Sequence, residues 1–235
     1  MKGEDNPQAE PGSRQRPIGK LWSVVEDIKA RGFQPRGIID VGAHRGTWTR
    51  GALRVYPGTP VLLIEPLEEM EGLLTEVVRE FPFCHYVKAG AGRRDGELLQ
   101  TIWQDDLSGC SFLPPPDPEE VQRPTVVRTI DGILSALPDF EPDFVKLDTQ
   151  GFELEALHGA PSLFGRTELF IVETMLYEFM PAYPLAREVI AYMADRGYEI
   201  YDVTELHRRP FDGALAQIDF AFVKRNGRFR TSNQW

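Results

Sequence analysis

Short apolar runs and amphipathic helical segments alternate along most of this chain, and this alternation restricts its fold more than any other feature. Short apolar runs predict buried strands, whereas apolar residues repeated every three or four positions predict helices. In the first half, the predicted strands are 37–42, 60–66 and 83–90, and the predicted helices are 18–32, 47–58 and 67–81. This order is typical of an α/β fold, in which helices cover a parallel sheet and ligands bind at the carboxyl ends of the strands.

The alternation resumes after a less regular middle part. There the predicted strands are 143–148, 168–174, 198–203 and 216–224, and the predicted helices are 153–164 and 184–197. The last two strands are expected to pair antiparallel at the edge of the sheet. In the middle part, predicted strands at 97–103 and 125–130 enclose residues 105–124, where five prolines argue against both a helix and a central strand. This segment is interpreted as a surface loop or as a lid over a binding site.

The length of 235 residues predicts one well-buried domain at 18–235, after a disordered tail at 1–17. The tail lacks the apolar region of a signal peptide, and no apolar run approaches the roughly 20 residues that cross a bilayer. Cys84 and Cys110 match neither a disulfide framework nor a zinc pattern, so we expect reduced thiols in a cytoplasmic protein. The net charge of −10 argues against nucleic acid or a membrane as partner, because phosphate-rich surfaces attract basic proteins.

The stretch "RGIIDVGAHRGTW" at 36–48 ends the first predicted strand with an acid, and two glycines follow. Asp40 is expected at the mouth of the crevice, and Gly42 and Gly46 in a turn where the missing Cβ lets the backbone approach a ligand. Glu65 ends the second predicted strand, at a spacing that suits a carboxylate bonded to ribose hydroxyls.

The turn "GAHRG" does not match the GxGxxG pattern of dinucleotide sites, and the GxxxxGK[ST] pattern of phosphate-binding loops is absent. An acid at the mouth would repel a pyrophosphate and would suit a cation. S-adenosylmethionine fits better, because it carries a sulfonium and an ammonium, and its carboxylate can sit at a helix N-terminus. A nucleotide-dependent oxidoreductase remains the less favoured alternative.

A second group of charged residues follows the strands of the second half. Lys146 and Asp148 alternate on one predicted strand and therefore share a face. Asp148 and Glu173 end neighbouring predicted strands at the same edge of the sheet. Glu153 is expected to stabilise a helix start, and residues 175–184 form either a wall over the crevice or a partly buried connection.

In this order, the motifs resemble the FkbM-type family of S-adenosylmethionine-dependent methyltransferases over residues 38–224. The motifs are "IIDVGAHRGTW", "LLIEP", "RTIDGIL", "DFVKLDTQGFELEALHGA", "FIVET" and "QIDFAFVK". The resemblance implies a Rossmann-like class I methyltransferase fold, with a seven-stranded, mostly parallel sheet, an antiparallel last strand and helices on both faces. It also implies O-methyl transfer to a hydroxyl of a small molecule, often a sugar or a secondary metabolite.

By this resemblance, Asp40, Gly42 and Gly46 line the methionine part of the cofactor, and Glu65 takes the ribose. Two neighbours, Ala43 and Pro66, complete the predicted cofactor-binding set. Many members of the family have Glu where this chain has Gln150, but Gln also occurs there, so the exchange does not indicate an inactive site.

A hydroxyl acceptor must lose a proton, and two hypotheses remain open for its removal. A side-chain base would accelerate transfer by roughly 10²–10⁴-fold. Alternatively, Mg²⁺ held by Asp148 and Glu173 would lower the pKa of the hydroxyl. The predicted catalytic residues are Asp148, Glu173 and Lys146, although Lys146 could also be their ion-pair partner. The four histidines receive no role.

The sequence leaves the class of activity partly open. N-methylation and a non-catalytic binding module remain alternatives within the same fold. The acceptor and the oligomeric state cannot be inferred from the sequence.

Overall fold

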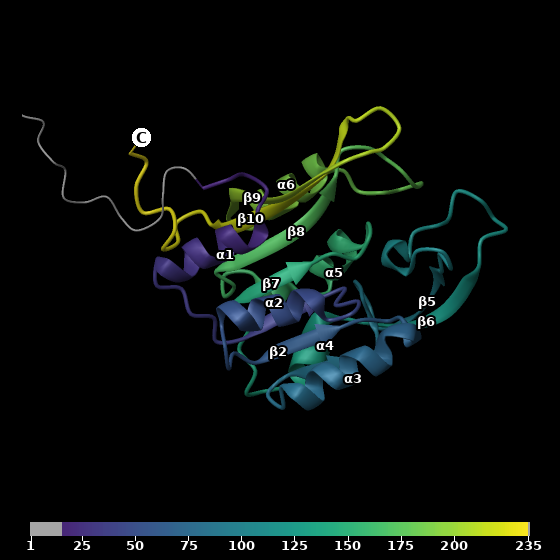
Figure 1. Ribbon diagram of the computed structural model, residues 1–235, viewed down its shortest axis with the longest axis horizontal. Coiled ribbons are helices and arrows are strands. Elements are labelled where there is room, and N and C mark those ends of the chain that lie inside the picture. The colour runs from purple at the N-terminus through teal and green to yellow at the C-terminus, as the bar shows by residue number, and fades with distance from the viewer. Residues whose placement is uncertain (1–15, 235) are drawn as a thin grey trace, which may run out of the picture.

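The computed structural model describes residues 16–234. Its main sheet has seven strands in the order β3-β2-β1-β7-β8-β10-β9 (Figure 1). The strands are β1 (Ile38–Val41), β2 (Val61–Ile64), β3 (His85–Val87), β7 (Phe144–Leu147), β8 (Leu169–Met175), β9 (Tyr198–Arg208) and β10 (Leu215–Lys224). All neighbours pair in parallel except β10, which is antiparallel to both β8 and β9. The predicted mostly parallel, seven-stranded sheet with an antiparallel last strand is confirmed.

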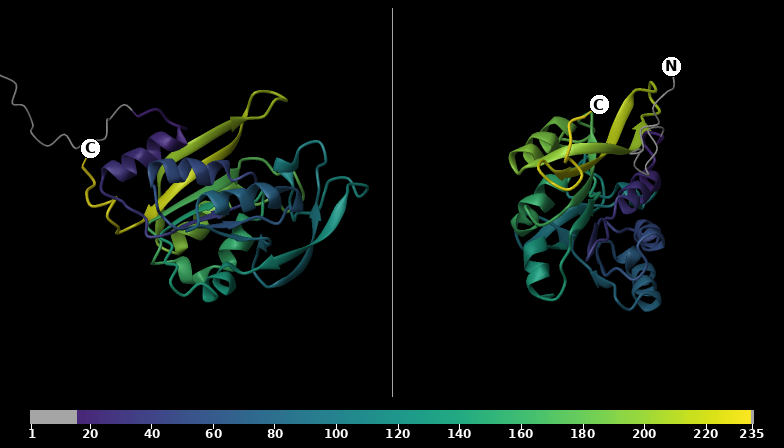
Figure 2. Two further views of the ribbon diagram at one scale, coloured as in Figure 1. Left: turned by 60° about the horizontal axis from the view of Figure 1, so that its bottom comes forward. Right: turned by 90° about the vertical axis from the view of Figure 1, so that its left-hand side faces the viewer.

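Helices cover both faces of this sheet (Figure 2, right). The helices of one face are α1 (Leu21–Ala30), α2 (Thr47–Val55) and α3 (Glu71–Glu80), and those of the other face are α4 (Ile130–Ser135), α5 (Glu153–His158) and α6 (Ala186–Asp195). Successive strand residues point to opposite faces, so Ile38 packs with α1–α3 and Ile39 with α4–α6. Both faces are therefore apolar, as expected of a buried parallel sheet.

A second, three-stranded sheet was not predicted. It has the order β4-β6-β5 and consists of β4 (Gly90–Ala91), β5 (Gly96–Thr101) and β6 (Gln122–Arg128). The predicted strand 83–90 is therefore wrong at its end, because β3 stops at Val87 and the chain enters another sheet. Strand β6 also contains Pro124, inside the segment predicted to lack a strand. Proline is tolerated there because β4 pairs only with Val127 and Arg128, which leaves one side of β6 free at Pro124.

Several predicted boundaries also differ. The helix predicted at 153–164 ends at His158, because Gly159 and Pro161 interrupt it, and a short 3-10 turn (η3, Pro161–Leu163) follows. Within the loop predicted at 105–124, another 3-10 turn forms (η2, Leu107–Gly109), and a third (η1, Glu68–Met70) precedes α3. The last two strands form a longer hairpin than predicted, with the connection reduced to 209–214.

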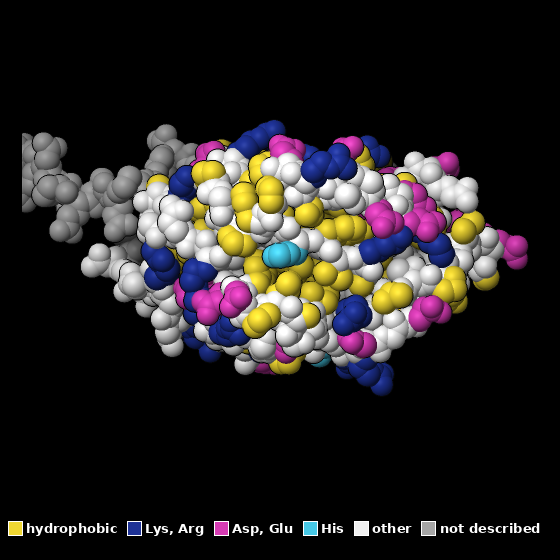
Figure 3. Space-filling model, turned by 90° about the horizontal axis from the view of Figure 1, so that it is seen from below, with side chains coloured by type: hydrophobic (Ala, Val, Ile, Leu, Met, Phe, Trp, Pro, Cys, Tyr) yellow, Lys and Arg dark blue, Asp and Glu magenta, His cyan; other side chains and the backbone are white. Residues whose placement is uncertain are grey.

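Residues 1–15 of the predicted tail lie outside the described residues, but Arg16 forms ion pairs with Asp27 and Asp202. Both cysteines are buried and free. Within residues 16–234, no helix combines the length and the apolar character that crossing a membrane requires. On the face in Figure 3, apolar side chains gather around a histidine and charged side chains of both signs border them, so the negative charge is not concentrated there.

Candidate active site

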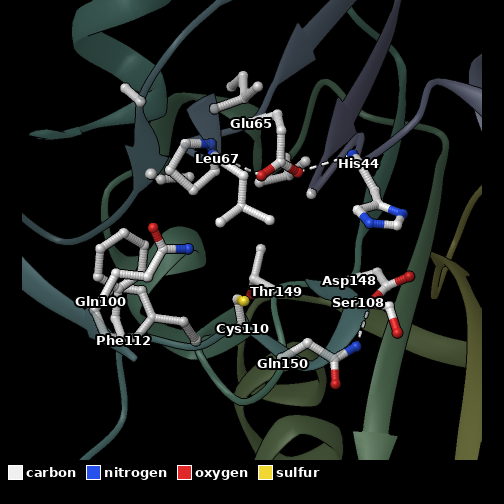
Figure 4. Close-up of a pocket in the computed structure, with 18 of the residues that line it drawn as sticks. His44, Glu65, Leu67, Gln100, Ser108, Cys110, Phe112, Asp148, Thr149 and Gln150 are labelled. Atoms are coloured by element: carbon white, nitrogen blue, oxygen red, sulfur yellow. Dashed lines mark hydrogen bonds between the residues drawn. The ribbon is translucent and has the colours of Figure 1, made fainter. Parts of the chain in front are cut away.

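A cavity of about 680 Å³, including its open mouth, lies at the carboxyl ends of β1, β2 and β7. Gly42, Glu65 and Asp148 line it from these strand ends, as Figure 4 shows for the two acids. The η2 segment and the small sheet close the opposite wall, with Ser108 and Gln100 among the lining residues. Part of the segment predicted as a loop or lid at 105–124 thus lines the cavity.

Glu65 is fixed in the cavity wall by two backbone hydrogen bonds. The amide N–H of His44 donates to Oε2 at 2.8 Å, and that of Leu67 donates to Oε1 at 3.0 Å (Figure 4). Burial raises the pKa of Glu65, and the two N–H groups oppose this shift. Each carboxylate oxygen can accept further hydrogen bonds, so Glu65 presents a preorganised acceptor to a ligand.

The turn after β1 is held by Lys146, whose Nζ donates to the carbonyl of Gly42 at 2.8 Å. The same ammonium lies 3.1 Å from Oδ1 of Asp40 and 3.4 Å from Oδ2 of Asp148. Burial alone would lower the pKa of Lys146, but the two carboxylates outweigh burial and raise it. Lys146 is therefore a buried ammonium behind the cavity wall, and not a group that projects into the cavity as the predicted catalytic role would require.

The expectation that Asp40 sits at the mouth is wrong. Its side chain is fully buried and accepts a hydrogen bond from Thr49 Oγ1 at 2.6 Å. Strand β1 continues to Val41, so Asp40 is not its last residue and points beneath α2 rather than into the crevice.

Of the other predicted cofactor residues, one lines the cavity and two lie behind its wall. Pro66 lines the cavity together with Gly42 and Glu65. Ala43 and Gly46 do not line it: Ala43 is buried in the core, and a Cβ at Gly46 would lie 2.8 Å from Val77 of α3. Gly46 is thus needed for the packing of α2 against α3.

Asp148 and Glu173 lie side by side, as their strand ends predict, and Gln150 bridges them. Its Nε2 donates to Asp148 Oδ1 at 2.9 Å and lies 3.1 and 3.2 Å from the two Glu173 oxygens. Burial acts to raise the pKa of Asp148, but Lys146 and these hydrogen bonds lower it. For Glu173, burial and then the neighbouring Asp148 raise the pKa well above its ordinary value. Burial and Asp148 thus favour the protonated form of Glu173, whereas Lys146 favours the ionised form of Asp148.

Glu153 supports the turn that presents this pair. Its Oε1 accepts hydrogen bonds from the backbone N–H and the hydroxyl of Thr149, at 2.7 and 3.0 Å. Since Glu153 is 3% exposed and engaged with the turn, the predicted role at a helix start agrees with its contacts.

These residues do not fit the magnesium hypothesis. The raised pKa of Glu173 favours its protonated form, which is a poor ligand, and the amide of Gln150 places a donor between the two carboxyl groups. In the part of the chain that the structure describes, no group of three or more His, Cys, Asp or Glu side chains is arranged to hold a metal ion. The reaction proposed below therefore contains no metal-dependent step.

The predicted site residues did not include three polar residues of the cavity. Within residues 16–234, the Nε2 atom of His44 is buried and has no hydrogen-bond partner, and burial, with the charge of Arg45, lowers the pKa of its ring. Gln100 accepts from Thr125 through Oε1 and directs its amide nitrogen into the cavity (Figure 4). Gln150 has the unusual positive φ of 54°. Their positions depend on the turn and on the small sheet, which no local pattern revealed.

The fold and this edge of the sheet define a class I methyltransferase. The model of the methyltransferase FkbM domain matches residues 40–200. The chain therefore belongs to the FkbM family of S-adenosylmethionine-dependent methyltransferases, as the motifs predicted.

Solved structures agree with this fold. The chain is similar to methyltransferase FkbM from Methylobacillus flagellatus KT, with a TM-score of 0.50 and 21% identity, over 79% of this chain and 43% of that protein. The chain thus spans less than half the length of that relative. It is also similar to magnesium protoporphyrin IX methyltransferase from Synechocystis PCC 6803 with bound S-adenosylmethionine, with a TM-score of 0.50 and 13% identity, over 87% of this chain and 77% of that protein. Among curated proteins, no match is found.

Proposed function

We propose that this protein transfers the methyl group of S-adenosylmethionine to a hydroxyl of a small molecule, such as a sugar or a secondary metabolite. The observation that carries the proposal is the ionised Asp148 on the wall of the same cavity that holds Glu65. A hydroxyl needs a proton acceptor during methylation, whereas a neutral amine does not, so an available carboxylate favours an oxygen acceptor.

The cavity offers a matching environment for each part of the cofactor. Glu65 would accept hydrogen bonds from the ribose hydroxyls. Phe112 and the amide of Gln100 lie at one end, where they suit the adenine, and His44 lies at the other, where it suits the charged methionine part (Figure 4). Asp40, Ala43 and Gly46 would support this site from behind.

Bound S-adenosylmethionine supplies an electrophilic methyl group on a sulfonium. Asp148 would accept the hydroxyl hydrogen bond and then the proton at a carboxylate oxygen, as the acceptor oxygen bonds to the methyl carbon and the bond from that carbon to sulfur breaks, which leaves S-adenosylhomocysteine. Lys146 keeps that carboxylate ionised, and Gln150 fixes its position. Alignment of the acceptor with the methyl group supplies much of the remaining acceleration.

The cofactor assignment is tested by calorimetric titration with S-adenosylhomocysteine, with NADH as the control ligand. We expect Glu65→Gln to weaken S-adenosylhomocysteine binding at least about tenfold, because a hydrogen bond to a charged acceptor contributes about 1.5–3 kcal/mol. Glu76→Gln, at an exposed position of α3, is the matched control and should bind normally. Binding of NADH instead of S-adenosylhomocysteine would contradict the cofactor assignment of this cavity.

The catalytic assignment is tested by transfer of a labelled methyl group to a panel of hydroxyl and amine compounds. Asp148→Asn should lower kcat by roughly 10²–10⁴-fold on hydroxyl acceptors, the range of general base catalysis. Affinity for S-adenosylhomocysteine should remain within a few-fold. Equal turnover by Asp148→Asn, or methylation of amines alone, would contradict the proposal.

A further inference from the structure

Gln100 of β5 breaks the usual distribution of polar and apolar side chains along a strand. The residue is 2% exposed, whereas Leu98 and Leu99, which precede it, are 42% and 52% exposed. A soluble protein ordinarily buries its leucines and exposes its glutamines. Burial of an amide costs free energy unless hydrogen bonds replace those made to water, so the inward position of Gln100 requires partners.

The protein supplies a partner for only one end of this amide. The hydroxyl of Thr125 on β6 donates to Gln100 Oε1 at 3.3 Å, and the same hydroxyl lies 3.2 Å from the carbonyl oxygen of Arg123. Within residues 16–234, Gln100 Nε2 donates no hydrogen bond, and it points into the cavity (Figure 4). While Thr125 donates to Oε1, a flip of the amide would bring two donors together. Gln100 therefore presents N–H groups to whatever occupies this end of the cavity.

A fixed aromatic ring lies at the same end of the cavity. Phe112 lines the wall near Gln100, and its ring centroid is 5.2 Å from that of Phe152 (Figure 4). On its other contact, a Cβ at Gly90 of β4 would lie 2.4 Å from Phe112 Cε2, so the ring packs directly on the backbone of the small sheet. Aromatic rings pack well against other flat rings. A flat ring beside a directed N–H donor suits a planar base with an acceptor nitrogen.

We propose that Gln100 is a specificity-determining residue that donates a hydrogen bond to a ring nitrogen of the adenine of the cofactor. Thr125 is then the positioning residue that sets the direction of the amide. The inference rests on the proposed function and deepens it, because it makes the small sheet of β4, β5 and β6 the part of the molecule that recognises the base.

The experiment uses three analogues of S-adenosylhomocysteine, in each of which N1, N3 or N7 of the adenine is replaced by C–H. Calorimetry measures the affinity of each analogue and of S-adenosylhomocysteine itself for the wild type and the variants. Because the analogues also differ in stacking, the ratio of the two affinities is compared between proteins. The variants are Gln100→Met, Thr125→Val and Thr125→Ser, and Gln34→Met, at an exposed position before β1, is the control.

We expect the wild type to bind one of the three analogues about 5- to 100-fold more weakly than S-adenosylhomocysteine, because a C–H leaves the buried donor without a partner. Gln100→Met keeps the length of the side chain without the donor, so it should bind that analogue and the parent about equally. Thr125→Val should reduce the ratio, because the amide can then flip. Thr125→Ser, which keeps the hydroxyl, and Gln34→Met should keep the ratio of the wild type.

The possible failures of this inference and of the proposed function are distinct. If S-adenosylhomocysteine binds but all three analogues bind equally well, or if the ratio is unchanged in Gln100→Met, this inference is overturned and the proposed function stands. An unchanged ratio in Thr125→Val overturns the positioning role of Thr125. If S-adenosylhomocysteine does not bind, both fail. The wild-type measurements and the Thr125 variants keep the test valid if Gln100→Met does not fold.

Discussion

At the scale of single residues, the position of Gln150 decides how the carboxyl groups of Asp148 and Glu173 coexist. Its left-handed backbone, with φ of 54°, turns the amide toward Asp148 and Glu173. One donor group thereby reduces the repulsion between two adjacent carboxyl groups. The adjacency of Asp148 and Glu173 could be predicted from their strand ends, but this bridge could not, because it depends on an unusual backbone conformation.

Gln150→Glu should therefore destabilise the protein in a pH-dependent manner. At pH 8 the new side chain adds a negative charge beside Asp148, and losing the donor should cost about 1–3 kcal/mol. At pH 5 the new carboxyl can keep a proton and donate it, so the loss should be smaller. Urea unfolding at both pH values measures the difference, with the exposed Gln104→Glu as control. A loss that is equal at pH 5 and pH 8 would refute the bridging role.

At the scale of elements, the turn between β1 and α2 and the turn after β7 fit closely together. Gly42 has φ of 74°, and a Cβ there would lie 1.8 Å from the carbonyl oxygen of Asp148. The glycine requirement could be predicted from the motif, but for a different reason. We expected room for a ligand, whereas the structure shows two backbone turns in contact.

Gly42→Ala and Gly58→Ala separate backbone strain from steric conflict. Gly58 has φ of 81°, but a Cβ there meets nothing within 4 Å, so its replacement should cost only about 1–2 kcal/mol for the left-handed conformation. Gly42→Ala carries the same strain plus the conflict with Asp148, which should add about 1–3 kcal/mol. Chemical denaturation measures both variants. Equal losses would show that the turns can separate at little cost.

At the scale of the whole molecule, the cofactor edge gathers segments that are distant in the chain. Leu113 of the proline-rich segment packs with Phe152, Met175 and Tyr183, so this segment and residues 175–184 meet over the turn after Asp148. The site therefore combines a conventional strand edge with two loops whose meeting no local pattern indicated. The cytoplasmic location stays a prediction.

The buried Asp219 of β10 should also make the stability of the protein depend on pH. Asp219 has a pKa of about 7, raised from 3.8, so its favourable contribution is complete below about pH 4 and is lost as the pH rises to 7. Asp219→Asn should therefore be more stable than the wild type at pH 8, and this advantage should shrink toward pH 4. Thermal unfolding across this range measures the difference.

Asp212 provides a contrast of opposite sign on the hairpin tip. The hydrogen bond from Arg209 lowers the pKa of Asp212 to about 2, so its contribution is present above pH 4 and is lost as the pH falls. Asp212→Asn should accordingly lose stability near neutral pH and approach the wild type in acid. If Asp219→Asn also lost stability near neutral pH, burial would not raise the pKa of Asp219 as we infer.

The sequence alone determined the class of this protein. The class follows from the alternation of strands and helices, from the turn after β1 and from the motif around Asp148. These features are recognised by local periodicity and residue spacing, which can be read without the tertiary structure. Tertiary structure decided which acids face the ligand. The side chain of Asp40 points away from the cavity because its strand is one residue longer than predicted. Lys146 supports the cavity wall from behind. Gln150 contacts Glu173 and Tyr183 packs with Leu113, both of which are distant in the sequence. Side-chain direction at a strand end depends on a single residue of register, and a cavity wall on segments that meet only after folding.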